Sequence, residues 1–295
     1  MFDLHVHSTA SDGTLTPTEL AEKGRGFSVL ALTDHDNTDG VAEFLSAAGG
    51  FGISGIELSV KPGEGYGHFH LLGLGIDHDD PSLKAFLRGI LDGRNERNRR
   101  MAANFARIGI AIPPDELAAY AHGEVLARPH FAAWLVDHGY VPDIAAAFSR
   151  YLKQNSPPET RCYESRYRPD PGVAFDVIHA AHGVAIMAHP RFWTSDATKL
   201  RAGLRKLKER GLDGIEAVYQ ANQPHETIDH LRAASELGLA VTAGSDFHGK
   251  NKPLITLGME VEDDRAFLAP FFAALEKYGS AAACRKCNFE NRQVQ

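Results

Sequence analysis

The sequence predicts an α/β protein in which a parallel sheet closes into a barrel, and two observations carry this prediction. Short apolar, β-prone runs alternate with helical segments along most of the 295 residues. Histidines and carboxylates gather where those runs end, beginning with Asp3-Leu4-His5-Val6-His7. About seven strands, most of them separated by helices, are typical of a barrel. The expected strands cover residues 2–7, 29–33, 53–59, 68–76, 184–188, 214–219 and 239–243.

Capping residues justify the helices between these strands. Thr16 is an N-cap, Pro17 takes the first helical position, and Glu19 completes a capping box. Asp39 is the expected cap of a second helix, which runs to about residue 48. The other helices of the barrel are expected near residues 173–181, 196–210 and 224–237.

The segment 77–161 breaks this alternation. It has helical spacing, several breakers such as Pro113-Pro114, and no convincing strand. We therefore predict a metal-binding barrel made of residues 1–76 and 162–295, with residues 77–161 inserted as a helical substrate lid.

Composition narrows the classes of function. The net charge of −7 and the pI of about 6.1 argue against a stable complex with nucleic acid, which needs surplus Lys and Arg. No apolar run approaches the roughly 20 residues of a membrane helix, and the expected location is the cytoplasm. Three cysteines, Cys162, Cys284 and Cys287, are too few for a disulfide framework. Cys284 and Cys287 have zinc-hook spacing but lack a second pair of ligands.

The N-terminal motif has the chemistry of half a metal site. Residues two apart on a strand face the same side, so His5 and His7 can reach one ion. The carboxyl ends of barrel strands converge on one mouth. Carboxylate and imidazole ligands there favour manganese, zinc or iron in a hydrolytic site. The same residue types recur in Thr33-Asp34-His35-Asp36, Gly55-Ile56-Glu57, His68-Phe69-His70, Ala188-His189-Pro190 and Gly244-Ser245-Asp246-Phe247-His248.

The order of these motifs, with Ser11-Asp12-Gly13, resembles the polymerase and histidinol phosphatase (PHP) superfamily over essentially the whole chain apart from the insertion. The insertion resembles the bacterial branch of nucleoside 3′,5′-bisphosphate phosphatases and related RNA-end exonucleases. The motifs behind this second resemblance are Gly93-Arg94-x-Glu96-Arg97 and Arg128-x-His130-Phe131. Together they imply a distorted seven-stranded barrel with two to three divalent metal ions, manganese being favoured over zinc or iron.

The resemblance also implies a role for each ligand. Nine residues hold three ions, with Glu57 as a bridge: His5, His7, Glu57 and Asp246 for the first ion, Glu57, His70 and His189 for the second, and Asp12, His35 and His248 for the third. His68 shares a strand face with His70 and is a rival ligand. Family members that act on histidinol phosphate usually have a histidine in place of Asp12, so this chain departs from them.

The implied chemistry is an in-line attack on phosphorus by a hydroxide that bridges the first two ions. Asp246 would orient that hydroxide or take its proton, and His130 is the candidate acid for the leaving group. Both are therefore candidate catalytic residues.

Positively charged side chains outside the predicted metal site indicate what kind of substrate the protein binds. Arg94 and Arg97 lie three apart on one predicted helix and can project together, although a solvated basic face is the alternative. Guanidinium groups bind phosphate bidentately, so a second phosphate on the substrate would explain them. The candidate substrate-binding residues are Arg94, Arg97, Arg128, His130 and Arg191. Related sequences usually have Gly-Arg where this chain has Arg191-Phe192, and Phe192 and Trp193 suit either stacking on a base or core packing.

The predicted function is a metal-dependent phosphoesterase acting on a small phosphorylated metabolite. The favoured reaction removes the 3′-phosphate of nucleoside 3′,5′-bisphosphates. Alternatives are a cyclic phosphodiesterase acting on a sugar cyclic phosphate and a 5′-3′ exoribonuclease acting on short RNA. A histidinol phosphatase, an amide hydrolase and a non-catalytic PHP module are less favoured. The expected partner is a small phosphorylated substrate such as a nucleotide or short RNA.

Overall fold

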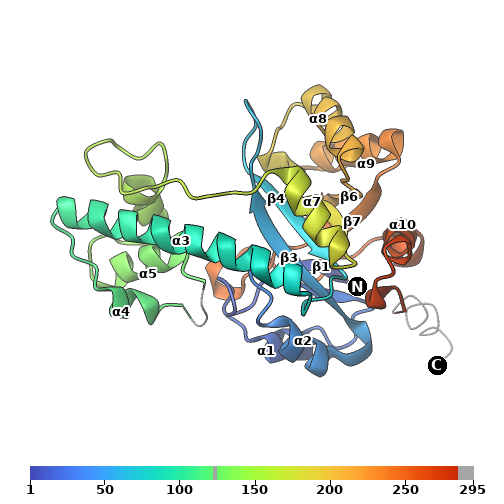
Figure 1. Ribbon diagram of the computed structural model, residues 1–295, viewed down its shortest axis with the longest axis horizontal. Helices are drawn as coiled ribbons and strands as arrows, with labels where there is room; N and C mark the ends of the chain where they lie inside the picture. Colours follow the sequence, from blue (N-terminus) through green and yellow to red (C-terminus); the bar gives the residue numbers. More distant parts are fainter. Residues whose placement is uncertain (122–124, 285–295) are drawn as a thin grey trace.

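A seven-stranded sheet forms the centre of the protein (Figure 1). The computed structural model describes residues 1–121 and 125–284. Each strand pairs with its neighbour in the chain, and His7 N donates to Phe247 O at 2.9 Å, which joins the first strand to the segment after the last. The sheet is thus a nearly closed barrel, as predicted. Its strands are β1 (Asp3–Val6), β2 (Leu30–Leu32), β3 (Gly52–Val60), β4 (Phe69–Leu74), β5 (Val184–Ala188), β6 (Gly214–Tyr219) and β7 (Ala240–Gly244).

One strand differs from the prediction of a parallel sheet, since β4 runs antiparallel to both β3 and β5. The eight residues 61–68 between β3 and β4 contain no helix, and a parallel connection needs a crossover of about a dozen or more residues. The chain therefore turns back as a hairpin, with Gly63 and Gly65 at positive φ. The reversal places the start of β4, and with it His70, at the mouth where the other strands end.

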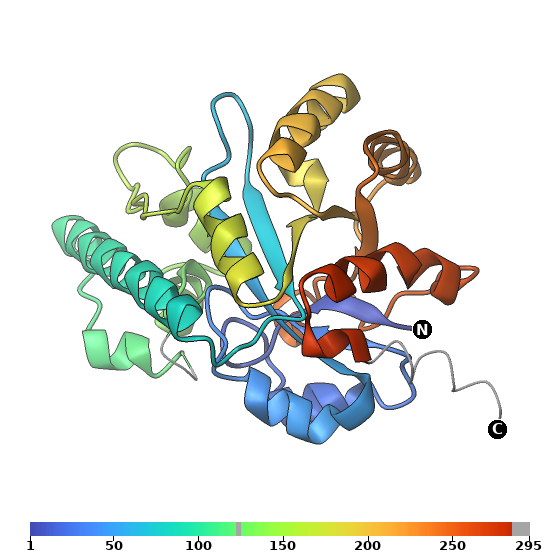
Figure 2. The same ribbon diagram turned by 45° about the vertical axis from the view of Figure 1, so that its right-hand side comes forward.

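Helices cover the outside of the barrel (Figure 2). They are α1 (Pro17–Lys23), α2 (Val41–Ala48), α7 (Pro171–Ala180), α8 (Ala197–Glu209), α9 (Pro224–Leu237) and α10 (Asp264–Lys277). The capping box of Thr16 and Glu19 is present, as predicted. The prediction for α2 was wrong by one residue, because Gly40 is its N-cap and Asp39 makes no side-chain cap. Short helical turns follow at η1 (Gly49–Phe51), η3 (Pro190–Phe192), η4 (Gly249–Asn251) and η5 (Ala281–Cys284).

The described part of the segment 77–161 is helical and contains no strand, as predicted. Its elements are α3 (Pro81–Arg107), α4 (Pro114–Ala118), α5 (Arg128–Asp137), α6 (Ile144–Ala147) and the π-helix η2 (Phe148–Leu152). In Figure 1, α3 runs from the barrel out to the smaller helices of the insertion. Leu83 and Ile90 of α3 pack into the barrel core, whereas Met101 and Phe105 pack into a separate core of the insertion. Helix α3 therefore contributes to both cores and connects the insertion to the barrel.

Two further features bear on the sequence predictions. No helix in the described ranges is long and apolar enough to cross a membrane. Cys162 is a buried free cysteine, and burial raises the pKa of its thiol to about 11. Cys287 lies outside the described residues, so the hypothesis of a zinc hook at Cys284 and Cys287 stays a prediction.

Candidate active site

The mouth of the barrel gathers all nine predicted metal ligands. Eight of the nine form three overlapping groups, and within each group one nitrogen or oxygen atom from every residue lies within 4.8 Å of the others. The groups are His5, His7, Glu57 and Asp246; His7, Asp12, His35 and His248; and His35, Glu57 and His70. His189, the ninth residue, follows β5 and places Nε2 3.0 Å from Glu57 Oε1. The first group is the set predicted for the first ion, and the second group contains the set predicted for the third ion. The third group shares only Glu57 and His70 with the set predicted for the second ion. The role of these residues as ligands stays a prediction.

The arrangement inside the first group fits a cation. Nε2 of His5 and Nε2 of His7 face one another at 3.1 Å, and Glu57 Oε2 lies 3.2 Å from the His7 nitrogen. His5, His7 and Glu57 have no solvent-exposed surface. Glu57 Oε2 and His35 Nδ1 are buried and lie 2.8 Å apart, and neither atom makes a hydrogen bond. Lone pairs that converge in a buried site cost free energy unless a cation lies between them, so these oxygen and nitrogen donors suit divalent metal ions.

The neighbours of these ligands fix their orientation. Glu216 on β6 accepts a hydrogen bond from His5 Nδ1 at 2.9 Å and another from the His189 amide at 2.7 Å. The first bond leaves His5 Nε2 as the nitrogen that faces the cluster. Tyr219 donates from its hydroxyl to Asp246 Oδ2 at 3.2 Å. Sequence reasoning missed Glu216, although a glutamate inside the apolar strand 214–219 was a usable signal.

Of the two candidate ligands His68 and His70, the structure brings His70 to Glu57. Its Nδ1 lies 2.7 Å from Glu57 Oε1. His68 precedes the strand, is exposed, and lines the cavity in front of the cluster. The walls of the cavity shield part of the His68 ring from water and so lower its pKa, and the charges of Arg168 and Arg128 lower that pKa further.

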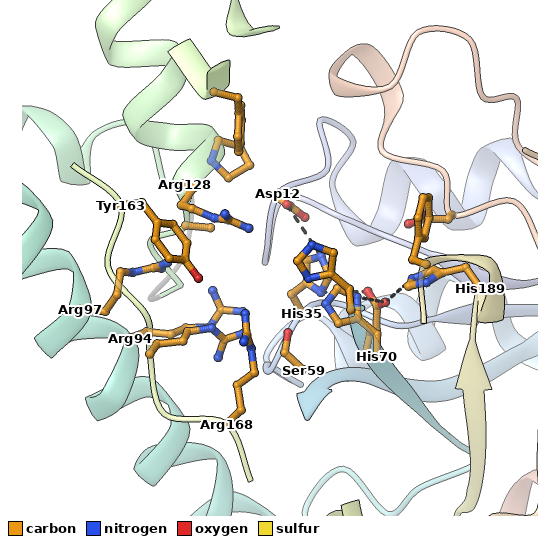
Figure 3. A pocket seen from close by; sticks show the side chains of 18 of the residues that line it. Asp12, His35, Ser59, His70, Arg94, Arg97, Arg128, Tyr163, Arg168 and His189 are labelled. Carbon is orange, nitrogen blue, oxygen red and sulfur yellow. Dashed lines mark hydrogen bonds and ion pairs between the residues drawn. The ribbon is translucent and has the colours of Figure 1, made fainter. Parts of the chain in front are cut away.

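Five arginines form a wall opposite the nine predicted metal ligands (the metal cluster), across a cavity of about 300 Å³. Figure 3 shows Arg94, Arg97, Arg128 and Arg168 on one side, with Asp12, His35, His70 and His189 on the other. The arginine wall consists of Arg94 and Arg97 on α3, Arg128 at the start of α5, and Arg166 and Arg168 on the extended segment before α7. One side of the cavity thus comes from the insertion and from residues 162–170, the return segment that leads back to α7, and the barrel supplies the other side.

Two arginines of this wall carry unpaired nitrogens. Arg97 and Arg166 are both almost fully buried, and Nη2 of Arg97 and Nη1 of Arg166 have no hydrogen-bond partner. Burial, with the nearby charges of Arg94 and Arg166, lowers the pKa of the Arg97 guanidinium well below its usual value. Such donors beside a cavity favour an anion as their partner.

Asp36 and two aromatic rings contact other arginines of the wall and hold their side chains in place. Asp36 Oδ2 accepts from Arg94 Nε at 2.9 Å and from Arg166 Nη2 at 2.8 Å. Although burial alone raises the pKa of Asp36, Arg166 and Arg94 hold it below its usual range. The Arg128 guanidinium lies 5.7 Å from the ring centre of Phe148 and 5.5 Å from that of Tyr163.

Two predicted site residues lie elsewhere. His130 is buried at the start of α5, where its Nδ1 accepts from the Ala127 amide at 3.0 Å, and it is not among the residues lining the cavity. Arg191 also lies outside the lining, since it donates to the carbonyl of Ala221 and lies 3.6 Å from Glu226. The structure therefore brings neither residue to the metal cluster.

Phe192 and Trp193, for which the sequence allows stacking on a base or core packing, have different surroundings. Phe192 is 45% exposed and lines the cavity. Trp193 is buried, stacks on Tyr66 at 4.0 Å between ring centres, and donates to Pro62 O at 2.7 Å. Trp193 therefore belongs to the packed core.

The return segment holds residues that sequence reasoning missed. Tyr163, Arg166 and Arg168 line the cavity, and the latter two alternate as they do on an extended chain. The residue before a proline is biased toward extended backbone, so the Arg-x-Arg run ahead of Pro169 was a usable signal. Lys252, which follows η4, also lines the cavity, and its Nζ lies 2.5 Å from Asp246 Oδ2.

Comparison with known proteins agrees with this geometry. The family model for the PHP domain matches residues 3–107. The 3′,5′-nucleoside bisphosphate phosphatase of Chromobacterium violaceum is 36% identical over 280 residues, which cover 93% of this chain and 96% of that protein. The 5′-3′ exoribonuclease of Haemophilus influenzae is 36% identical over 267 residues, which cover 86% of this chain and 95% of that protein.

A solved structure extends the likeness to the fold. It is an amidohydrolase from Chromobacterium violaceum with bound sulfate and no metal, and it matches with a TM-score of 0.81 at 34% identity, covering 94% of this chain and 96% of that one. The family match, the two relatives and the cluster at the mouth lead to one conclusion. This chain belongs to the PHP domain family and is a metal-dependent phosphoric ester hydrolase.

Proposed function

We propose that this enzyme removes the 3′-phosphate of nucleoside 3′,5′-bisphosphates. One observation carries the proposal: the metal cluster and the arginine wall face one another across a single cavity, and Arg97 and Arg166 hold buried, unpaired nitrogens in that wall. A substrate with one phosphate satisfies only one of the two sides. A molecule with two phosphates a nucleoside apart satisfies both, and the Chromobacterium relative is named for such a substrate.

The nine residues at the mouth would hold two to three divalent ions, and donors that are all oxygen or nitrogen suit manganese, zinc or iron, of which we propose manganese. Such ions supply a nucleophile at neutral pH and neutralise phosphoryl oxygens. Asp246 has one oxygen in the cluster, with Oδ1 3.3 Å from His7 Nε2, while Oδ2 faces Tyr219 and Lys252. It is therefore placed to hold the proton of the attacking water.

The leaving 3′-oxygen needs a proton donor, and Lys252 is better placed than His130. Its ammonium group lies beside Asp246 and lines the cavity. His130, in contrast, accepts from the Ala127 amide within its own helix turn. We assign the donation of this proton to Lys252 on that geometry.

A second candidate function is the trimming of short RNA from its 5′ end. The first cavity adjoins a second one of about 560 Å³, and His68, Arg128, Phe148 and Tyr163 line both. Lys153 and two amide side chains complete the second cavity, and these groups suit a further nucleotide. The Haemophilus relative is named for this activity.

The test is a phosphate-release screen with the manganese-loaded full-length protein. The substrates are a nucleoside 3′,5′-bisphosphate, a sugar cyclic phosphate, histidinol phosphate and a short 5′-phosphorylated RNA whose products are separated by chromatography. We expect the highest kcat/KM for the bisphosphate, with the nucleoside 5′-monophosphate as the product. Faster turnover of the cyclic phosphate or of histidinol phosphate would contradict the proposal.

A further inference from the structure

Asp36 joins four segments that meet between the metal cluster and the arginine wall. It follows His35 on the loop after β2, and its amide donates to Glu57 O at 2.9 Å. Its Oδ1 accepts from the Ser59 amide on β3 at 3.1 Å. Its Oδ2 accepts from Arg94 on α3 and from Arg166 on the return segment.

The carboxylate occupies some donors of each arginine and leaves others free for the cavity. Arg94 uses Nε and Nη2 on Asp36, and its Nη1 makes no hydrogen bond to any residue in the described ranges. Arg166 uses Nη2, and its buried Nη1 is unpaired. Each guanidinium plane is thus held at a fixed angle, with the remaining nitrogen available to an anion in the cavity that both arginines line.

Asp36 is itself an anion, so simple charge does not explain its place beside a phosphate site. Removing its charge would make the wall more positive and, on electrostatics alone, would strengthen the binding of a phosphate. Its two oxygens accept hydrogen bonds from two arginines and from Ser59. The buried backbone at Asp36 also adopts a positive φ of 52°, an uncommon conformation for a residue other than glycine.

We propose that Asp36 is a positioning residue for substrate recognition. It holds Arg94 and Arg166 in the geometry that the uncleaved phosphate requires, and it ties that phosphate site to the strand that carries Glu57. The assignment rests on the proposed function, because it concerns the second phosphate of the substrate.

The experiment compares Asp36→Asn with the wild type, both loaded with manganese. Steady-state kinetics are measured on a nucleoside 3′,5′-bisphosphate and on an aryl monophosphate, whose single phosphate goes to the metals. We expect Asp36→Asn to raise KM for the bisphosphate by about tenfold or more, with kcat and both constants for the aryl ester changed by less than about threefold. Metal content per chain is measured alongside and should equal that of the wild type.

Two further variants separate position from charge. Asp36→Glu keeps the charge but moves the carboxylate by one methylene, so positioning predicts the same selective rise in KM. Asp39→Asn removes an equal charge from an exposed side chain of the same loop and should behave as the wild type.

The outcomes distinguish the two proposals. A wild type that does not prefer the bisphosphate overturns the proposed function and this assignment with it. If the wild type shows the preference, a lower KM in Asp36→Asn means that charge dominates, and unchanged kinetics mean that the contact has no role. Wild-type kinetics in Asp36→Glu would exclude positioning. Equal losses on both substrates, or lost metal, would place Asp36 in the fold or the metal centre. Each of these results overturns the assignment of Asp36.

Discussion

Glu57 lies at the centre of the metal cluster, and both of its oxygens face histidines. Oε1 lies 2.7 Å from His70 Nδ1, and Oε2 lies 2.8 Å from His35 Nδ1. Burial alone raises the pKa of Glu57, but His35, His70 and His5 lower it well below its usual range. The side chain is therefore an ionised carboxylate whose two oxygens can contact two different ions.

Glutamine has nearly the shape of glutamate but no charge, so Glu57→Gln tests whether the charge of Glu57 is needed to bridge two ions. A neutral amide bridges two cations poorly, so we expect Glu57→Gln to lower turnover by several orders of magnitude while circular dichroism shows an unchanged fold. The exposed Glu260→Gln serves as the control and should retain full activity. Normal turnover with normal metal content in Glu57→Gln would refute the bridging role.

Arg128 provides a test of recognition apart from chemistry. Its guanidinium lies between Phe148 and Tyr163, lines the cavity and donates to Leu152 O at 3.2 Å. Removing one charge-assisted contact to a phosphate costs about 1.5–3 kcal/mol, roughly tenfold to a hundredfold in kcat/KM. Arg128→Ala should therefore impair hydrolysis of a nucleoside bisphosphate far more than that of an aryl monophosphate.

Steady-state kinetics on both substrates decide this prediction. Arg99→Ala is the matched control, because Arg99 is an exposed arginine on α3 that pairs with Glu96. Equal losses on both substrates would place Arg128 at the reacting phosphate or in the fold. An Arg128→Ala enzyme with unchanged kinetics would show that the phosphate does not contact this arginine.

The sequence predicted the metal side of the cavity more completely than the arginine side. The nine metal-site residues belong to short motifs that lie within the strands or shortly after them, where the strand backbone fixes the side-chain direction. Arg166 and Arg168 lie on an extended segment without a periodic pattern, and only packing brings them to α3. Arg191 lies only two residues after His189, yet the turn at η3 points it to Glu226. Adjacency in sequence does not determine direction within such a turn.

At the scale of elements, the cap of α1 is a local feature that sequence alone predicts. Thr16 accepts from the Glu19 amide at 3.2 Å, and Glu19 Oε2 accepts from the Thr16 amide at 2.8 Å. We expect Thr16→Ala to lower the free energy of unfolding by about 1 kcal/mol, measured by urea denaturation. Thr16→Ser keeps the acceptor and should lose little. A change in kcat/KM in either variant would contradict this purely structural role.

The direction of β4 depends on what connects it, which a pattern of apolar residues does not show. Residues 69–74 form a strand, as predicted, but apolar content alone does not distinguish a parallel from an antiparallel neighbour. The short connection after β3 decides it. The same reversal explains why His70 at the start of its strand meets Glu57 in the middle of the preceding one. Loop length was thus the missing part of the sequence reasoning.

At the scale of the whole molecule, the metal site connects distant parts of the chain. Its predicted ligands run from His5 on β1 to His248 after β7, and the barrel closes where these two segments pair. The arginine wall comes from α3, α5 and the return segment. Ions at the mouth would therefore hold together both ends of the barrel, whereas a doubly phosphorylated substrate would connect the barrel to the insertion.

This arrangement predicts that metal binding stabilises the entire fold. A ligand that binds the native state and not the unfolded chain stabilises it by about 2.7 kcal/mol at a hundredfold excess over Kd. We expect manganese to raise Tm with increasing concentration and a chelator to reverse the rise, as measured by thermal unfolding. Elemental analysis in excess manganese should approach about three ions per chain, the number that three predicted ligand sets hold.

Asp12→Ala provides the matched variant, because Asp12 belongs to one group, with His7, His35 and His248, while Glu57 belongs to two others. It should lose about one ion and only part of the stabilisation by manganese, whereas Glu57→Gln should lose most of it. A wild-type count that never exceeds two ions would remove the third site. A Tm that does not respond to manganese would mean that the ligands at the mouth are held by the protein alone, and that the ions contribute to the chemistry without connecting the ends of the barrel.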